Sequence, residues 1–206
     1  MKKLGIFLSI EGIEGVGKTT AVRFIEQYLK QKEIDFILTR EPGGTEIAEQ
    51  IRHILLNPNS EEILATNTEL LLMFACRAQH IQQVILPALQ EQKWVVCDRY
   101  IDASYAYQGG GRNISLAHIK MLDDWIVNEL LPDKTILLDA PPEVGLARAK
   151  HRGPQDRIEQ EAVDFFDRVR RAYLLRAEED PKRFRVIDAT KDLETVQDEI
   201  IRVLNE

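Results

Sequence analysis

The sequence contains little cysteine. Only Cys76 and Cys97 occur among 206 residues, and both lie inside apolar runs. Small buried thiols are common in such runs, whereas disulfides belong to oxidising compartments. The two cysteines therefore predict buried side chains in a protein of the reducing cytoplasm.

Long hydrophobic runs are also missing. No stretch approaches the roughly 18 apolar residues that a membrane-spanning helix needs. The start, MKKLGIFLSIEG, only faintly resembles a signal peptide, because Glu11 interrupts its apolar part and a phosphate-binding motif follows at once. We interpret this segment as a first strand and expect a soluble protein without a membrane partner.

An excess of positive charge is absent as well. The chain has 27 Lys and Arg against 34 Asp and Glu, a net charge of -7. Nucleic-acid backbones are held by many Lys and Arg contacts, so a general nucleic-acid surface is disfavoured, and an anionic ligand must meet a local positive pocket. No repeat or low-complexity segment divides the chain, so we expect one domain over residues 1–206.

Short apolar runs alternate with longer amphipathic segments along the chain. Continuous apolar strands are buried on both faces, which predicts an α/β fold with a mostly parallel sheet covered by helices on each side. Ligands of such sheets bind at the carboxyl ends of the strands. The expected strands are 4–10, 34–39, 94–97, 135–140 and 185–189, and the expected helices lie near 18–30, 45–56, 67–90, 115–130, 142–151, 159–179 and 192–204.

A phosphate-binding motif, G-x-x-x-x-G-K-[ST], follows the first predicted strand and precedes a predicted helix. Backbone amides of such a loop surround phosphate oxygens, Lys18 would reach the β- and γ-phosphates, and the Thr19 hydroxyl would bind Mg²⁺. A GTPase would normally carry N-K-x-D, which is absent, and a motor ATPase would usually be larger, so a kinase of a small acceptor remains. The expected ATP-binding residues are Gly12, Ile13, Glu14, Gly15, Val16, Gly17, Lys18, Thr19 and Thr20.

Charged residues at the ends of the next two strands are candidates for the acceptor site. The turn that contains Arg40 can hold an anion or simply lead into a helix capped by Thr45. Asp98 can bind Mg²⁺, directly or through water, or orient the acceptor phosphate, and Arg99 can grip a phosphate with two hydrogen bonds; a structural ion pair is the alternative. Residues 104–112 are expected to form a polar, aromatic loop.

Two further segments combine residue types that suit a nucleotide site. Phe74 and Arg77 project from one face of a helix, where they could stack on a base and donate to its edge, although the spacing alone favours a core Phe beside a marginal Arg. Basic residues around Gly153-Pro154 suggest a lid over about 148–158 that closes over phosphates; a solvated basic helix end is the alternative. The basic residues are Arg148, Lys150, Arg152 and Arg157.

Several motifs together resemble the thymidylate kinases over nearly the whole chain. They are G-I-E-G-V-G-K-T, R-E-P-G-G-T, F-A-C-R-A-Q-H, D-R-Y, A-Y-Q-G-G-G-R and D-R-I-E-Q-E followed by D-F-F. The resemblance implies a P-loop nucleoside monophosphate kinase fold with a five-stranded parallel sheet, a homodimer, and phosphorylation of dTMP to dTDP by MgATP for dTTP synthesis. The segment Tyr100-Ile101-Asp102 departs from common members, which leaves the role of Asp102 undefined.

The resemblance also implies roles for individual residues. Phe74 would stack on thymine, Arg77 would read its edge, Arg99 and Arg40 would hold the acceptor phosphate, and Glu14 would approach the sugar. Tyr107 would disfavour a ribose, while Ser104 and Gln108 would line the base and sugar.

The family divides by the position of its catalytic arginine, either inside the phosphate loop or in the lid. The loop of this chain has no arginine, so the lid would supply it, with Arg152 first and Arg148 and Arg157 behind it. The expected catalytic set is completed by Lys18, Asp98 and Arg99. A kinase of another monophosphate, a deoxynucleoside kinase and a nucleotide-dependent switch are the competing functions.

Overall fold

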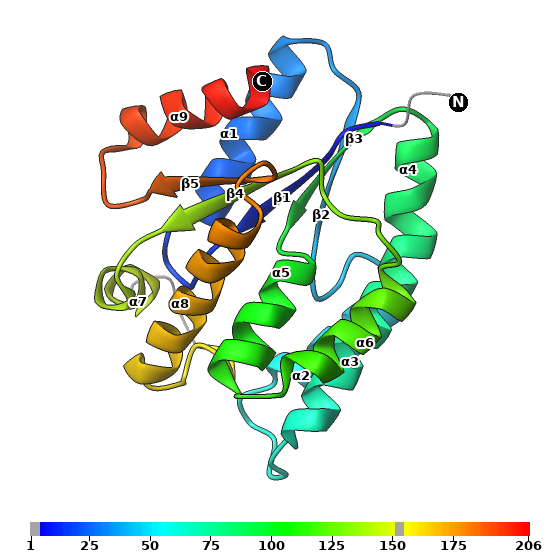
Figure 1. Ribbon diagram of the computed structural model, residues 1–206, viewed down its shortest axis with the longest axis vertical. Helices are drawn as coiled ribbons and strands as arrows, with labels where there is room; N and C mark the ends of the chain where they lie inside the picture. The colour runs from blue at the N-terminus through cyan, green and yellow to red at the C-terminus, as the bar shows by residue number, and fades with distance from the viewer. Residues whose placement is uncertain (1–4, 151–154) are drawn as a thin grey trace.

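A sheet of five parallel strands forms the centre of the computed structural model, which describes residues 5–150 and 155–206 (Figure 1). The strands lie in the order β2-β3-β1-β4-β5. The predicted α/β fold with a five-stranded parallel sheet is confirmed. The strands are β1 (Phe7–Glu11), β2 (Phe36–Arg40), β3 (Trp94–Asp98), β4 (Lys134–Asp139) and β5 (Phe184–Asp188).

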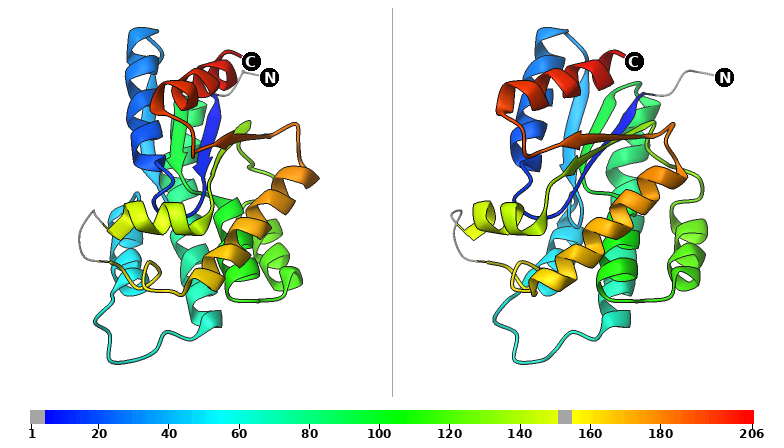
Figure 2. Two further views of the ribbon diagram at one scale, coloured as in Figure 1. Left: turned by 90° about the vertical axis from the view of Figure 1, so that its left-hand side faces the viewer. Right: turned by 60° about the vertical axis from the view of Figure 1, so that its left-hand side comes forward.

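Helices cover both faces of this sheet (Figures 1 and 2). Leu8 and Val96 share a buried cluster with Ile25 of α1, whereas Phe7 and Val95 belong to the cluster of α3 and α4. Alternate strand residues thus supply the two cores, as the two-residue period of a strand requires. The helices are α1 (Lys18–Gln31), α2 (Glu46–Leu56), α3 (Thr66–His80), α4 (Leu86–Gln90), α5 (Ile101–Ser104), α6 (Leu116–Ile126), α7 (Pro142–Lys150), α8 (Val163–Glu179) and α9 (Leu193–Asn205), and a π-helical segment, Ile81–Ile85, joins α3 to α4.

The segment after β3 is helical, so the expectation of a loop there was wrong. Helix α5 continues directly into a π-helical segment, Tyr105–Gly111, that packs against α8. Every residue from Ile101 to Gly109 is buried, so no polar face remains to produce the helical periodicity that a surface helix shows. Close approach to α8 explains Gly111, because an added Cβ would lie 2.5 Å from the ring of Phe165.

The carboxyl ends of the strands converge on one edge of the sheet. The register places Ile10 of β1 beside Asp98 of β3, and Asp98 beside Arg40 of β2. The segments that follow these strands therefore start side by side, which is where an α/β sheet binds its ligands. Across residues 5–150 and 155–206, no helix has both the length and the apolar character needed to cross a membrane.

Candidate active site

The phosphate-binding motif forms the turn between β1 and α1, as the sequence predicted. Ile13 and Val16 are anchored in the core, while Thr19 and Thr20 lie exposed at the start of α1. Gly15 has a φ of 75°, and a Cβ there would lie 1.8 Å from the carbonyl oxygen of Gly145 in α7. A side chain at position 15 would therefore separate the loop from the helix that leads into the predicted lid.

Lys18 turns back over the loop. Its Nζ donates to the carbonyl oxygens of Ile13, at 2.7 Å, and Gly12, at 3.0 Å. Burial, reinforced by the neighbouring charge of Arg99, lowers the pKa of Lys18 to about 8. The ammonium group thus occupies a desolvated position in which an anionic ligand would stabilise its charge strongly.

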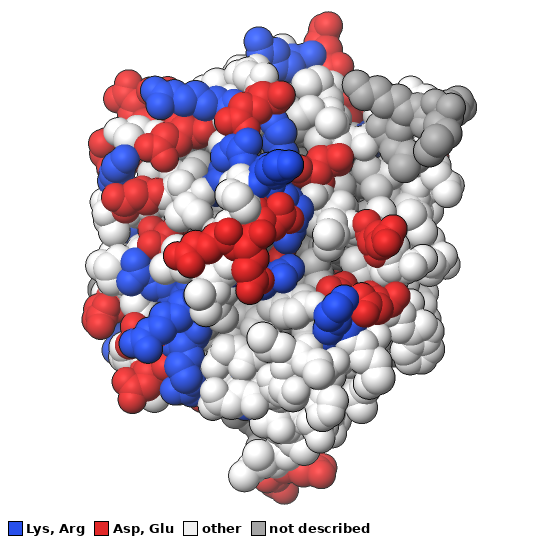
Figure 3. Space-filling model, in the orientation of Figure 1, with Lys and Arg blue, Asp and Glu red and all other residues white. Residues whose placement is uncertain are grey.

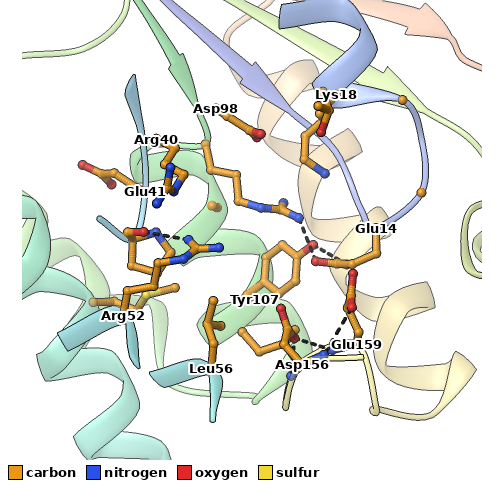
Figure 4. Close-up of a pocket in the computed structure, with 18 residues that line it drawn as sticks. Glu14, Lys18, Arg40, Glu41, Arg52, Leu56, Asp98, Tyr107, Asp156 and Glu159 are labelled. Carbon is orange, nitrogen blue, oxygen red and sulfur yellow. Dashed lines mark hydrogen bonds and ion pairs between the residues drawn. The ribbon is translucent and has the colours of Figure 1, made fainter. Parts of the chain in front are cut away.

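A pocket opens beside this loop and brings together residues from distant parts of the sequence (Figure 4). Its lining includes nine of the site residues that the sequence predicted, which are Glu14, Gly15, Gly17, Lys18, Thr19, Arg40, Asp98, Arg99 and Tyr107. The other lining residues are Glu41, Pro42, Arg52, Leu56, Met73, Ala103, Asp156, Ile158 and Glu159.

Three arginines line this pocket, and two of them, Arg40 and Arg52, lie opposite the phosphate loop (Figure 4). Arg40 is half exposed and forms an ion pair with Glu49 at 2.9 Å, and Arg52 donates to the carbonyl oxygen of Pro42 at 2.7 Å. Burial and the charge of Arg40 lower the pKa of Arg52. Repulsion between like charges at close range favours binding of an anion such as a phosphate group between them. Thr45 also caps α2, since its hydroxyl accepts from the amide of Ala48 at 3.1 Å.

Arg99 joins the phosphate loop to the acceptor side of the pocket. Its guanidinium donates to the carbonyl oxygen of Gly12 at 2.6 Å and to Glu14 at 2.7 Å, and it lies over the ring of Tyr107. The Tyr107 hydroxyl donates to the other oxygen of Glu14 at 2.7 Å. Arg99 has a φ of 69°, an unfavourable conformation for a residue with a Cβ. Such strain is often found at functional sites, where the surrounding contacts enforce it.

Asp98 and Thr19 provide the oxygen ligands that suit Mg²⁺. The Oδ1 atom of Asp98 is buried and has no hydrogen-bond partner in the described part of the chain. A buried carboxylate oxygen left unpaired is costly, and a hydrated magnesium ion would satisfy it. Since both residues line the pocket beside Lys18, the donor set fits a magnesium ion bound together with a triphosphate.

The residues expected to contact a base lie behind the pocket and do not line it. Phe74 and Arg77 are each 2% exposed, and the guanidinium of Arg77 lies 4.8 Å from the centre of the Phe74 ring. Arg77 donates to Glu41 at 2.8 Å, to Ser104 at 2.9 Å and to the carbonyl oxygen of Tyr100 at 3.0 Å. Gln108 is fully buried, and its Oε1 atom has no partner among the described residues. Two guanidinium N–H bonds and this amide oxygen are therefore left for a ligand.

The predicted lid arginines do not converge in the described structure. Arg148 donates to the carbonyl oxygen of Ala189, in the turn after β5, at 3.0 Å. Arg157 donates to Glu69 at 2.7 Å and points away from the pocket. Arg152, the expected catalytic arginine, lies outside the described residues.

Comparison with known proteins identifies the family. The family model described as thymidylate kinase matches residues 10–200. The chain is 52% identical to the thymidylate kinase of Ectopseudomonas mendocina, over 97% of this chain and 95% of the relative. The identity to the enzyme of Alcanivorax borkumensis is 48%, over 98% and 97%. The chain belongs to the thymidylate kinase family. The resemblance drawn from the motifs is confirmed.

A solved structure agrees with this assignment to the thymidylate kinases. The crystal structure of thymidylate kinase from Ehrlichia chaffeensis has a TM-score of 0.79 at 33% identity, and the match covers 98% of this chain and 99% of that one. The predicted nucleoside monophosphate kinase fold is thus confirmed together with the class of enzyme.

Arg52 is the positively charged pocket residue that the sequence did not reveal. It lies on α2 twelve residues after Arg40, and the amphipathic pattern of α2 gives no sign that this polar position faces a ligand. The helix follows the R-E-P-G-G-T turn directly, so its polar face begins at the carboxyl edge of the sheet. An arginine on that face was the signal that could have revealed it.

Proposed function

We propose that this chain transfers the γ-phosphoryl group of MgATP to the 5'-phosphate of dTMP, giving dTDP and ADP for the synthesis of dTTP. The observation that carries this proposal is one pocket in which Arg40 and Arg52 face the phosphate loop with its Lys18, while Arg99 is bonded to that loop. One cationic group would hold the acceptor phosphate, and the loop would hold the triphosphate. Two phosphate sites facing each other favour direct transfer between them.

The reaction needs alignment and charge stabilisation more than proton transfer. The acceptor phosphate is already ionised, so no strong general base is required. Arg99 would hold the attacking phosphate in line, and Lys18 would stabilise the charge that develops on the transferred group. Mg²⁺, held by Thr19 and by Asp98 directly or through water, would neutralise the triphosphate when bound. Exclusion of water from the pocket would favour transfer over hydrolysis.

The base and sugar would lie on the α3 and α5 side of the acceptor phosphate. We infer that Phe74 stacks on thymine and that Arg77 donates to its edge, with Ser104 and Gln108 nearby. Glu14 would approach the 3'-hydroxyl side of the sugar, and Tyr107 would disfavour a ribose. Phe74 and Ser104 directly follow Met73 and Ala103, which line the pocket, and this supports the arrangement. Entry of the base requires these buried side chains to become accessible.

Donor-side and lid roles complete the proposal. The phosphate loop from Gly12 to Thr20 would bind ATP, and Arg148, which donates to the carbonyl oxygen of Ala189, stays a second candidate for the catalytic arginine. Among the lid arginines, Arg152 stays the predicted contributor of charge to the transition state.

The acceptor preference tests the proposed reaction. We expect ADP formation from MgATP to be strong with dTMP and weak with dUMP, dCMP, dGMP, AMP or thymidine, in assays that include an acceptor-free control. Preference for another monophosphate would retain the phosphate chemistry and reject the base site. Activity on thymidine would indicate a deoxynucleoside kinase, and equal ADP formation in every assay would indicate a hydrolytic switch.

We further propose that the enzyme is a cytoplasmic homodimer joined through α3 and α6. Figure 3 shows a broad area without charged side chains over these helices, interrupted by one cluster of charge. Its exposed apolar residues are Leu71, Leu116, Met121 and Trp125, of which Trp125 is 76% exposed. Apolar patches of this kind usually mark protein interfaces.

The mass of the protein in solution tests this interface. We expect light scattering to give the mass of a dimer for the wild type and of a monomer for Trp125→Glu, because an isologous contact places the new charge on both sides of the interface. The control is Leu193→Glu, which places the same charge on an exposed leucine of α9. A dimer that survives Trp125→Glu would reject this face as the interface.

A further inference from the structure

Glu69 of α3 is a buried carboxylate at which three side chains meet. It is 1% exposed, and it accepts hydrogen bonds from Arg157 at 2.7 Å, from Gln108 at 2.9 Å and from Arg112 at 3.3 Å. Burial raises the pKa of Glu69, but donation by Gln108 and the charges of Arg112 and Arg157 outweigh burial and lower it. Glu69 is therefore ionised and holds its three partners as an anion.

Arg157 uses Glu69 as one of three anchors. Besides the bond to Glu69, its Nε donates to the carbonyl oxygen of Leu55 at 2.8 Å, and its amide donates to that of Leu56 at 3.2 Å. The Arg157 side chain is 20% exposed. Arg157 is thus fixed to the end of α2 and to α3. Its side chain does not point to the phosphates, which the sequence predicted it to contact.

The neighbours of Arg157 form one wall of the acceptor pocket. Asp156, Ile158 and Glu159 line this pocket, and Figure 4 shows Asp156 and Glu159 at its edge. The Arg157 side chain between them is not part of the lining and contacts the buried Glu69 instead. The Asp156 carboxylate accepts from the amides of Ile158 and Glu159, each at 2.9 Å, so the turn is internally braced. The turn is thus braced within itself and fastened at its centre, where Arg157 contacts α2 and α3.

A second link joins the far end of this turn to the same carboxylate. Arg112 contacts Glu69 through Nε, and its Nη1 forms an ion pair with Glu161. Glu69 therefore holds the segment 156–161 through both Arg157 and the Arg112–Glu161 pair. The same carboxylate fixes Gln108, next to Tyr107 on another wall of the pocket.

We propose that Glu69 and Arg157 are positioning residues of the acceptor site, because their buried ion pair sets the position of the wall formed by Asp156, Ile158 and Glu159. This inference rests on the proposed function, because it requires that the acceptor nucleotide binds in this pocket. It separates Arg157 from the catalytic arginines, since Arg157 acts through the wall and touches no reacting group. Loss of the pair loosens the wall, so binding of the acceptor must order it again, while the donor side keeps its contacts.

Arg157→Gln tests this role through the separate kinetic constants. We expect the KM for dTMP to rise roughly tenfold, since the wall must then be ordered on binding, while kcat and the KM for ATP stay within about twofold of wild type. Arg157→Lys, which keeps a charge for Glu69 but cannot also reach Leu55, should give an intermediate KM. The control is Arg185→Gln, which removes an ion pair with Glu206 at the edge of the sheet and should leave all three constants unchanged.

Other outcomes of these assays would overturn the proposal. A fall of kcat by roughly 10²-fold at an unchanged KM for dTMP would make Arg157 a catalytic arginine. A parallel rise of both KM values, or a lowered melting temperature with no change in KM, would indicate general structural loosening. If the wild type is inactive on dTMP, the proposed function fails; an active enzyme without the selective KM effect would reject only the positioning role.

A double-mutant cycle tests whether the effect runs through Glu69. If the ion pair is responsible, adding Glu69→Gln to Arg157→Gln raises the KM for dTMP no further than Glu69→Gln alone, whereas independent roles would multiply the two effects. Because Glu69→Gln also leaves Arg112 without its carboxylate, all kinetics are measured well below each variant's melting temperature. A multiplicative result would overturn the link between the two residues.

Discussion

Lys18→Ala is expected to lower the turnover of dTMP by roughly 10²-fold or more, the scale on which one preorganised charged donor contributes to a transition state. The Lys18 ammonium now donates to the carbonyl oxygens of Gly12 and Ile13 inside the phosphate loop. A triphosphate in the loop would receive that charge at close range, with little water between them. Steady-state kinetics with saturating MgATP and dTMP measure the loss, and a turnover within tenfold of wild type would contradict the assigned role.

The pKa of Lys18 gives this prediction a second readout. Burial places it at about 8, below the ordinary value for lysine, and a bound triphosphate must raise it again by stabilising the ammonium form. ATP therefore binds best below pH 8, where the free protein already holds the proton. Above that pH, binding requires proton uptake, so the KM for ATP should rise with pH with a limiting slope of about tenfold per unit.

A charge-preserving variant separates this titration from other effects. Lys18→Arg keeps a cation that does not lose its proton in this range, so its KM for ATP should lack the rise between about pH 7.5 and about pH 9.5. Lys18→Ala should lack it as well. A wild-type slope that persists in both variants would assign the titration to another group.

The fold was predictable because its signals are local. Apolar runs such as Leu4–Ile10 and the glycine-rich loop after it specify strand, turn and helix from neighbouring residues alone. Helix α5 and the π-helical segment after it escaped detection because burial on all sides removes the contrast between polar and apolar faces. Helical periodicity in a sequence arises from that contrast, so a fully buried helix shows little of it.

The site was predictable only where residues follow a strand directly. Arg40, Asp98 and Arg99 line the pocket because the carboxyl ends of adjacent parallel strands coincide. Helical spacing correctly places Phe74 and Arg77 near one another, but it cannot tell whether that face meets solvent, a ligand or a core. A cluster of basic residues in the sequence likewise does not show where each side chain points. Arg157 lies among the predicted lid residues, yet it contacts Glu69.

The contacts of Asp102, which belongs to no recognised motif, could not be predicted from the sequence either. It is fully buried, and it accepts hydrogen bonds from Arg176 of α8 at 2.9 Å and from Arg183, just before β5. Both partners lie more than seventy positions further along the chain, so only the tertiary structure brings them to Asp102. The carboxylate thereby fixes α5, the helix that begins two residues after Arg99 and continues toward Tyr107.

Arg99→Ala is expected to lower kcat/KM for dTMP by roughly 10²- to 10³-fold, because it removes a preorganised cation from the point where acceptor and donor phosphates meet. The variant also leaves the Glu14 carboxylate beside Tyr107 without its positive partner, which adds repulsion toward an anionic acceptor. Competition assays that follow dTDP formation at low dTMP concentration measure kcat/KM directly.

Matched variants at position 99 distinguish charge from backbone strain. Alanine, lysine and arginine all carry a Cβ, so each bears the cost of the positive φ, and a difference in activity between them reports the side chain. Arg99→Lys keeps the charge but loses the fork that contacts Gly12 and Glu14 together, so we expect a loss intermediate between wild type and Arg99→Ala. If Arg99→Ala keeps more than about a tenth of wild-type kcat/KM, Arg99 is a structural partner of Glu14. The acceptor phosphate would then be held by Arg40, which is half exposed, and by Arg52, since their like charges repel each other and could move to meet it.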